Sequence, residues 1–206
     1  MKIYQIYIVL FCLLANSCGS TKSTVKDLTW QEEIAAFQNA KNKEYSTKVT
    51  SPLDKEAFKA FTGHDFYPLD KNYRVTANFL RTPREKVFKM LTSSDRLPEY
   101  RKYGVLKFKI DDQAYTLNVY QDLETSTVRK YKDLLFLPFK DKTNGKVTHG
   151  GGRYIDFKIP NSQTVILDFN KAYNPFCAYS EKFSCPLPPF ENHLIIEIPV
   201  GMKLIN

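Results

Sequence analysis

Residues 105–120 read VLKFKIDDQAYTLNVY, and this stretch decides the fold class. Apolar and polar residues alternate on both sides of Asp111-Asp112, which is the pattern of two half-buried strands joined by a two-residue turn. The turn sets a register in which apolar side chains share one face of the hairpin and polar side chains the other. The facing pairs are Phe108 with Tyr115, Leu106 with Leu117, and Lys107 with Thr116.

Other segments show the same alternation, or are short apolar runs between turns rich in Pro, Gly and Asn. They are Tyr73–Phe79, Leu134–Phe139, Tyr154–Ile159, Thr164–Phe169 and Leu194–Ile198. About seven or eight strands are expected in all, with no helix alternating between them. This order favours an antiparallel sheet over an alternating βα architecture.

Two helices are predicted ahead of the strands. Thr29 and Glu32 have capping-box spacing at the start of an amphipathic stretch. Ser51 suits the N-cap of a second, shorter helix that begins with Pro52 and stops at Gly63. We therefore expect a mainly β (α+β) fold, an antiparallel sheet curled into a barrel or sandwich with one or two N-terminal helices.

The composition is that of a globular protein. Of the 206 residues, 43% are hydrophobic, 14% aromatic and 25% charged, which excludes a disordered, collagenous or coiled-coil chain. A four-ligand zinc site would need nearly all of the four cysteines and three histidines, so the composition argues against a metal site. The glycine-rich run at residues 150–152 is followed by a strand and not a helix, so it is no phosphate or dinucleotide loop, and no cofactor is expected.

The start of the chain has the pattern of a secretory signal peptide, with Lys2, an apolar run over Ile3–Leu14 and a small-residue exit ending at Cys18. The apolar run is too short to span a bilayer. Its end resembles a bacterial lipobox, which implies that Cys18 carries a lipid. An amphipathic N-terminal helix or an uncleaved anchor is the alternative.

The expected organisation is a signal peptide over residues 1–17, a lipidated linker over 18–27 and a single β-rich domain over 28–206. The protein would then be anchored in the bacterial cell envelope through Cys18, facing the periplasm or the cell surface. Its oligomeric state is left open by the sequence.

Export would leave two cysteines, Cys177 and Cys185, in the folded part. In an oxidising envelope this spacing predicts a disulfide, and closing so short a loop would contribute about 2.5 kcal/mol of stability. The alternative is a reactive Cys177 thiolate served by His149, a pairing that no motif supports.

The positive charge of the chain is local. Of its net charge of +8, the stretch Lys71–Lys109 carries eleven basic and three acidic residues. Beside a lipid anchor such a stretch predicts contact with anionic lipid or an envelope polymer. Nucleic acid is a poor partner in that compartment. The alternative is an ordinary solvated strand surface.

Residues 143–192 contain several uncommon residue types in a fixed order. The runs are TNG at 143–145, GGGRY at 150–154, DFN at 168–170, AYNP at 172–175, CAY at 177–179, CPLPP at 185–189 and EN at 191–192. This succession resembles family 1684 of the domains of unknown function, an uncharacterised bacterial family, and Ser51-Pro52-Leu53 and residues 135–141 match it too. The resemblance covers the chain from about Trp30 and implies no activity. His149 stands where the family more usually has Tyr.

We place a candidate ligand pocket in this segment. Its predicted ligand-binding residues are Gly151, Arg153, Asp168, Asn170, Tyr173, Asn174, Tyr179 and Glu191. By alternation along its strand, Arg153 lies on the same face as the apolar core residues. It is therefore expected at a pocket mouth, paired with Asp168 or Glu191.

The aspartates of two predicted strands allow a second interpretation. Pairing Ile159 with Val165 places Asp156 opposite Asp168, whereas a register shifted by two places Tyr154 there, and like charges favour the shifted register. The first hypothesis is a non-catalytic ligand-binding or scaffolding protein. The alternative is a hydrolase acting on an envelope component through Asp168 with Asp156 or Glu191, and with Arg153.

Overall fold

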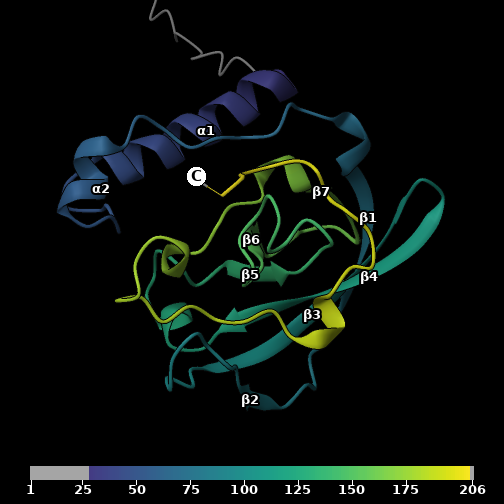
Figure 1. The fold of residues 1–206 in the computed structure, drawn as a ribbon. Helices are drawn as coiled ribbons and strands as arrows, with labels where there is room; N and C mark the ends of the chain where they lie inside the picture. Colours follow the sequence, from purple (N-terminus) through teal and green to yellow (C-terminus); the bar gives the residue numbers. More distant parts are fainter. Residues whose placement is uncertain (1–27, 205–206) are drawn as a thin grey trace, which may run out of the picture.

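The computed structural model of the chain describes residues 28–204, and Figure 1 shows their arrangement. The predicted signal peptide, the lipidation of Cys18 and the linker lie outside these residues. The dominant element is one curled antiparallel sheet that forms a half-barrel, with α1 (Trp30–Ser46) lying across one end of it. The prediction of a mainly β, α+β fold with helices ahead of the strands is confirmed.

The sheet follows the order β6-β5-β4-β3-β1-β7, and β2 pairs with β3 outside this path. The strands are β1 (Arg74–Arg81), β2 (Val87–Lys89), β3 (Glu99–Ile110), β4 (Gln113–Asp122), β5 (Leu134–Phe139), β6 (Arg153–Lys158) and β7 (Thr164–Asp168). Because β6 and β7 stand at opposite ends of this order, the sheet does not close into a full barrel. An isolated bridge between Tyr154 and Tyr173 links β6 to the chain just after β7.

The hairpin of β3 and β4 has the predicted register. Phe108 pairs with Tyr115, Leu106 with Leu117 and Lys107 with Thr116. Asp111 and Asp112 turn the chain with φ angles of 48° and 61°, which a two-residue hairpin turn of this twist requires. The long hairpin crosses the molecule below β5 and β6 in Figure 1, so its curl shapes the half-barrel.

The predicted strand over Leu194–Ile198 is wrong. Its neighbour is the chain just after β5, where Lys140 forms a single parallel bridge with His193 and Lys142 N donates to Ile196 O at 2.9 Å. A ladder does not form because the chain leaves the sheet after Phe139. The segment still buries Leu194, which explains its apolar pattern.

The helices differ in how well they follow the sequence. Thr29 and Glu32 form the predicted capping box at the start of α1. The second helix, α2 (Lys55–Ala60), begins later than predicted, because the Asp54 carboxylate and not Ser51 caps it. Five short 3-10 turns complete the described part of the chain: η1 (Lys71–Tyr73), η2 (Thr125–Thr127), η3 (Phe169–Lys171), η4 (Phe176–Ala178) and η5 (Phe190–Asn192).

The core fills the inside of the curled sheet. Alternate residues of every long strand enter it, and Leu106, Leu117 and Leu137 are fully buried there. α1 buries Ile34 and Tyr45 and is joined to η3 by an ion pair between Glu33 and Lys171. Within residues 28–204, no helix is long and apolar enough to cross a membrane.

Candidate functional site

Arg153 is buried and stabilises the fold by joining distant parts of the chain. It begins β6, its side chain is 0% exposed, and its guanidinium lies 2.8 Å from the Asp141 carboxylate. It also donates to the carbonyls of Ile198, at 2.7 Å, and of Val200. The predicted partners, Asp168 and Glu191, are therefore wrong, and Arg153 does not reach a pocket mouth. Alternation along the strand predicts that Arg153 points inward, but it does not indicate Asp141 as its partner.

Asp168 and Asn170 hold the end of β7 against α1 and against the chain at the start of β1. The Asp168 carboxylate accepts from the indole of Trp30 at 2.7 Å and lies 3.5 Å from the guanidinium of Arg74. Asn170 donates to the same carboxylate at 2.8 Å and to the Asp70 carbonyl at 2.9 Å. The contacts to Trp30, Arg74 and Asp70 tie segments that are far apart in the chain, whereas the contact between Asn170 and Asp168 is local.

Both predicted registers for Asp156 and Asp168 are wrong, because β6 pairs with β5 and β7 pairs with β1. The backbone partner of Asp168 is Arg74, of opposite charge. The two aspartates do border one small hollow of about 140 Å³. That volume is below the range of about 300–1,000 Å³ that small-molecule sites usually have.

Asn174 and Asn192 are buried and hold the C-terminal segment. The Asn174 amide donates to the Tyr179 hydroxyl at 2.9 Å and to the Lys203 carbonyl at 2.8 Å. The Asn192 amide donates to the carbonyls of Asn118, at 2.9 Å, and Pro138, at 2.7 Å. The neighbouring Glu191 is exposed. Much of the family motif therefore serves the fold.

A cleft of about 320 Å³ lies where α1 meets β6 and the loop over residues 173–186. We call it the α1 cleft. Its walls carry four aromatic side chains, together with charged groups at Lys41, Glu44 and Asp156, and include Cys185. The aromatic side chains are Tyr154, Tyr173, Phe176 and Phe183.

The polar groups of the α1 cleft are arranged around Tyr173. Its hydroxyl donates to Asp156 at 2.7 Å, and burial together with this carboxylate holds the pKa of Tyr173 well above its usual value. The ammonium of Lys41 stands 3.9 Å from the centre of the Tyr173 ring and 3.1 Å from Glu44. The cleft thus combines a ring face on which the Lys41 ammonium lies with the Asp156 carboxylate beside it.

The two predicted bridge residues meet at the border of this cleft. Cys177 and Cys185 are free cysteines in the structure, and the backbone N–H of Cys177 donates to the Cys185 sulfur at 3.1 Å. The disulfide stays a prediction. Gly151 lies under the His149 ring, where a β-carbon would come within 2.5 Å of Nε2. Gly151 therefore acts by leaving room for His149.

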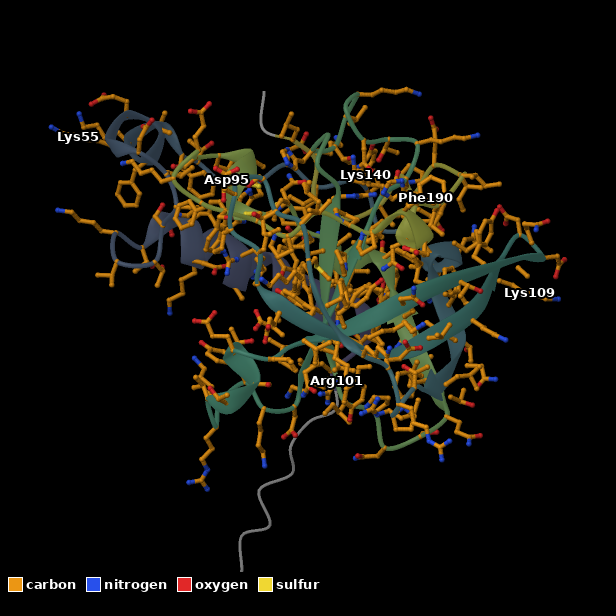
Figure 2. The ribbon with its side chains drawn as sticks, turned by 90° about the horizontal axis from the view of Figure 1, so that it is seen from below. Lys55, Asp95, Arg101, Lys109, Lys140 and Phe190 are labelled. Carbon is orange, nitrogen blue, oxygen red and sulfur yellow. The ribbon has the colours of Figure 1, made fainter. Side chains whose placement is uncertain are left out.

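A larger hollow, of about 610 Å³, lies over β1, β3 and β4. Its lining includes Lys107, Lys109 and Thr164, which are exposed strand residues outside the family motif. Figure 2 shows Lys109 at the far tip of the hairpin, on the opposite side of the molecule from Lys55. We place the candidate site in the α1 cleft, because its walls are more enclosed by aromatic groups and include motif residues.

Sequence reasoning found Tyr173 and missed the cleft's wall on α1. Lys41 and Glu44 lie one helical turn apart, which sequence spacing does indicate. Nothing in the sequence joins that helix face to the loop over residues 173–186. In the part of the chain that the structure describes, no cluster of three His, Cys, Asp or Glu residues could hold a metal ion.

Comparison with known proteins supports the resemblance seen in the motif. The family model described as a protein of unknown function, DUF1684, matches residues 59–203. The solution NMR structure of an uncharacterised protein from Haloarcula marismortui is 32% identical to this chain, with 84% of this chain and 94% of that one covered and a TM-score of 0.66. The comparison with curated proteins finds no match.

Proposed function

The chain belongs to the DUF1684 family of proteins of unknown function, and we propose that it is a lipid-anchored protein of the bacterial cell envelope whose α1 cleft binds a small ligand without converting it. The observation that carries the binding proposal is the α1 cleft itself. It lies beside the motif segment, and its volume of about 320 Å³ suits a small molecule.

The chemistry of the cleft indicates the class of ligand. Rings of Tyr154 and Phe183 offer apolar faces, which favour a ligand with a flat apolar part. Asp156 and the Lys41–Glu44 pair offer a carboxylate and an ammonium at the border, which favour a ligand with both a donor and an acceptor. We therefore propose a compact ligand with an apolar ring and polar substituents.

The hydrolase alternative has less support. Asp168 accepts hydrogen bonds from Trp30 and Asn170, so its carboxylate is occupied in holding the fold. Arg153 is enclosed by protein, and its charge is neutralised by Asp141. A general acid or base must reach the bond being cleaved, and neither side chain is placed to do so.

Ligand binding is tested with the full chain, purified in detergent. Compounds of the proposed class are screened by thermal shift, and binders are measured by calorimetry against Phe183→Ala and Phe190→Ala. Phe183 lines the α1 cleft, whereas Phe190 is 83% exposed on a different surface, beside Lys140 in Figure 2.

We expect Phe183→Ala to weaken binding about tenfold or more, since burying a phenylalanine is worth roughly 1.5–3 kcal/mol. Phe190→Ala should leave the affinity unchanged. Equal weakening by both variants, or no binder at all in a broad screen, would count against the α1 cleft as a binding site.

The lipid anchor is tested separately. We expect Cys18→Ser to lose fatty-acid labelling and membrane fractionation, while Cys12→Ser, a control in the preceding apolar run, keeps both. Labelling that survives in Cys18→Ser would refute the anchor at that residue.

We also propose that the basic stretch contacts anionic lipid. Lys107 and Lys109 are exposed on β3, and charges near a membrane surface are worth about 1 kcal/mol each. Replacing both by Glu should weaken binding to phosphatidylglycerol vesicles about tenfold or more at low salt. The control is the same double change at Lys55 and Lys59 on α2, and equal losses from the two variants would contradict the proposal.

A further inference from the structure

Cys177 and Cys185 lie side by side in the loop over residues 173–186. The backbone N–H of Cys177 donates to the Cys185 sulfur at 3.1 Å. The Cys185 backbone is fixed by Ser93, whose hydroxyl accepts from Cys185 N at 3.0 Å and whose N–H donates to Cys185 O at 2.9 Å. The Cys185 sulfur therefore lies against the backbone of Cys177 in the folded chain.

The two thiols have different surroundings. Cys185 is 7% exposed and Cys177 is half-buried, so more of the Cys177 residue is open to solvent. The side chains of Cys185, His149 and Ser93 are polar groups close to the Cys177 sulfur. Such contacts stabilise a thiolate, which is the attacking species in thiol chemistry.

The titration of the pair follows from these contacts. The hydrogen bond from Cys185, with those from His149 and Ser93, lowers the pKa of Cys177 to about 5. The pKa of Cys185 is raised, because its proton is held by the Cys177 sulfur and because it is buried. Arg96 is the cation that faces Cys185, and its guanidinium donates to Ser184 O at 3.2 Å.

The motif glycine next to this pair has a role in the same arrangement. Any side chain at Gly151 would collide with the imidazole of His149. With glycine there, the ring can reach Cys177. The half-buried cysteine, the buried cysteine and the histidine thus form one cluster from two separate segments.

We propose that Cys177 and Cys185 form a redox-active dithiol that reduces disulfides, with Cys177 as the attacking thiol and Cys185 as the resolving thiol. The proposal is independent of ligand binding in the α1 cleft. It goes beyond a structural bridge, which would need neither a partly accessible cysteine nor a histidine near it.

The reaction has two steps. The Cys177 thiolate attacks one sulfur of a substrate disulfide, so that a mixed disulfide forms and one substrate thiolate leaves and takes up a proton. Cys185 then loses its proton and attacks the Cys177 sulfur, which releases the second substrate thiol. The pair is oxidised by two electrons to a disulfide, and the substrate disulfide is reduced to two thiols.

The test uses the full chain, reduced with dithiothreitol, freed of it and then mixed with oxidised glutathione. Trypsin cleaves after Lys171, Lys182 and Lys203, so Cys177 and Cys185 fall in different peptides, which mass spectrometry reads separately from the other cysteines. We expect the wild type to form the Cys177–Cys185 disulfide while folded, and Cys185→Ser to accumulate glutathione on Cys177. Cys177→Ser should stay unmodified at Cys185.

Three results would overturn the proposal: thiols that react only after urea unfolding, glutathione trapped on Cys185 in preference to Cys177, or no trapped adduct in folded Cys185→Ser. A pulse of iodoacetamide on the wild type keeps the test independent of variant folding, and alkylation of Cys185 before Cys177 would also refute it. His149→Leu should slow alkylation of Cys177, whereas His193→Leu, at an exposed histidine, should not. Equal rates in these two variants would remove His149 from the cluster.

Discussion

The buried ion pair of Arg153 and Asp141 makes the most direct prediction about this fold. Both side chains are 0% exposed, and Asp141 uses both carboxylate oxygens. One oxygen faces Arg153, and the other accepts from Thr143 N at 2.8 Å and from Ile198 N at 3.2 Å. Asp141→Asn keeps the shape of the side chain but leaves the Arg153 charge buried without a counter-charge.

The expected loss is about 3–5 kcal/mol of unfolding free energy, since removing one partner of a buried pair leaves the other charge uncompensated. For a chain of this size that corresponds to a fall in Tm of roughly 6–20 °C. Urea unfolding followed by tryptophan fluorescence measures it, because Trp30 is the single tryptophan and bonds to Asp168. Adding Arg153→Met should recover part of the loss.

The matched control is Asp65→Asn. Asp65 lies 3.1 Å from Lys203, but its side chain is 62% exposed, so the same substitution should cost less than about 1 kcal/mol. If Asp141→Asn costs no more than Asp65→Asn, or if adding Arg153→Met deepens the loss, the explanation by an uncompensated buried charge is refuted.

Three further predictions concern stability, each measured by urea unfolding. His64 is buried among aromatic rings with both ring nitrogens unpartnered, and burial lowers its pKa from 6.5 to about 4. The unfolded chain therefore binds a proton that the folded chain excludes, so the unfolding free energy should fall by about 3 kcal/mol as the pH falls from 6.5 to 4. If the unfolding free energy of His64→Phe depends on pH in the same way, this explanation is contradicted. Gly152→Ala should lower the unfolding free energy by about 1–3 kcal/mol more than Gly145→Ala does. Both glycines have positive φ, but only at Gly152 would a β-carbon meet the Phe139 carbonyl, at 2.7 Å. Equal losses in the two variants would refute the clash. Asn192→Ala should cost about 3 kcal/mol or more, because it leaves buried backbone groups of Asn118 and Pro138 unpaired, and a loss below 1 kcal/mol would show that water replaces the amide.

The sequence predicted local structure well where one pattern left a single solution. Alternation about Asp111-Asp112 determined the hairpin register, because a slip by one residue would expose Phe108 and bury Lys107. The Thr29–Glu32 capping box likewise depends on neighbours within one turn. The strand predicted over residues 194–198 is wrong, because an apolar run can be buried equally well as a strand or as irregular chain.

The candidate site depended on long-range packing that no spacing records. The pairing of β6 with β5 and of β7 with β1 separated Asp156 from Asp168 in the sheet. The partner of Arg153 is Asp141, which lies after β5, and alternation along the strands does not indicate this pairing. The polar residues typical of a ligand site are also the ones that form hydrogen bonds with buried backbone groups. From the sequence, Asn170 and Asn174 therefore fit ligand binding and hydrogen bonding within the fold equally well.

The sequence by itself determined the class of fold, the register of its central hairpin and the family, because each of these follows from the order of residues along a short stretch of chain. Only the tertiary structure decided which motif residues are used inside the fold and which border the α1 cleft. It also brought Cys177, Cys185 and His149 together. The physical reason is that contacts between distant segments are selected by the burial of the whole core, and a residue's own neighbours in sequence carry no record of that choice.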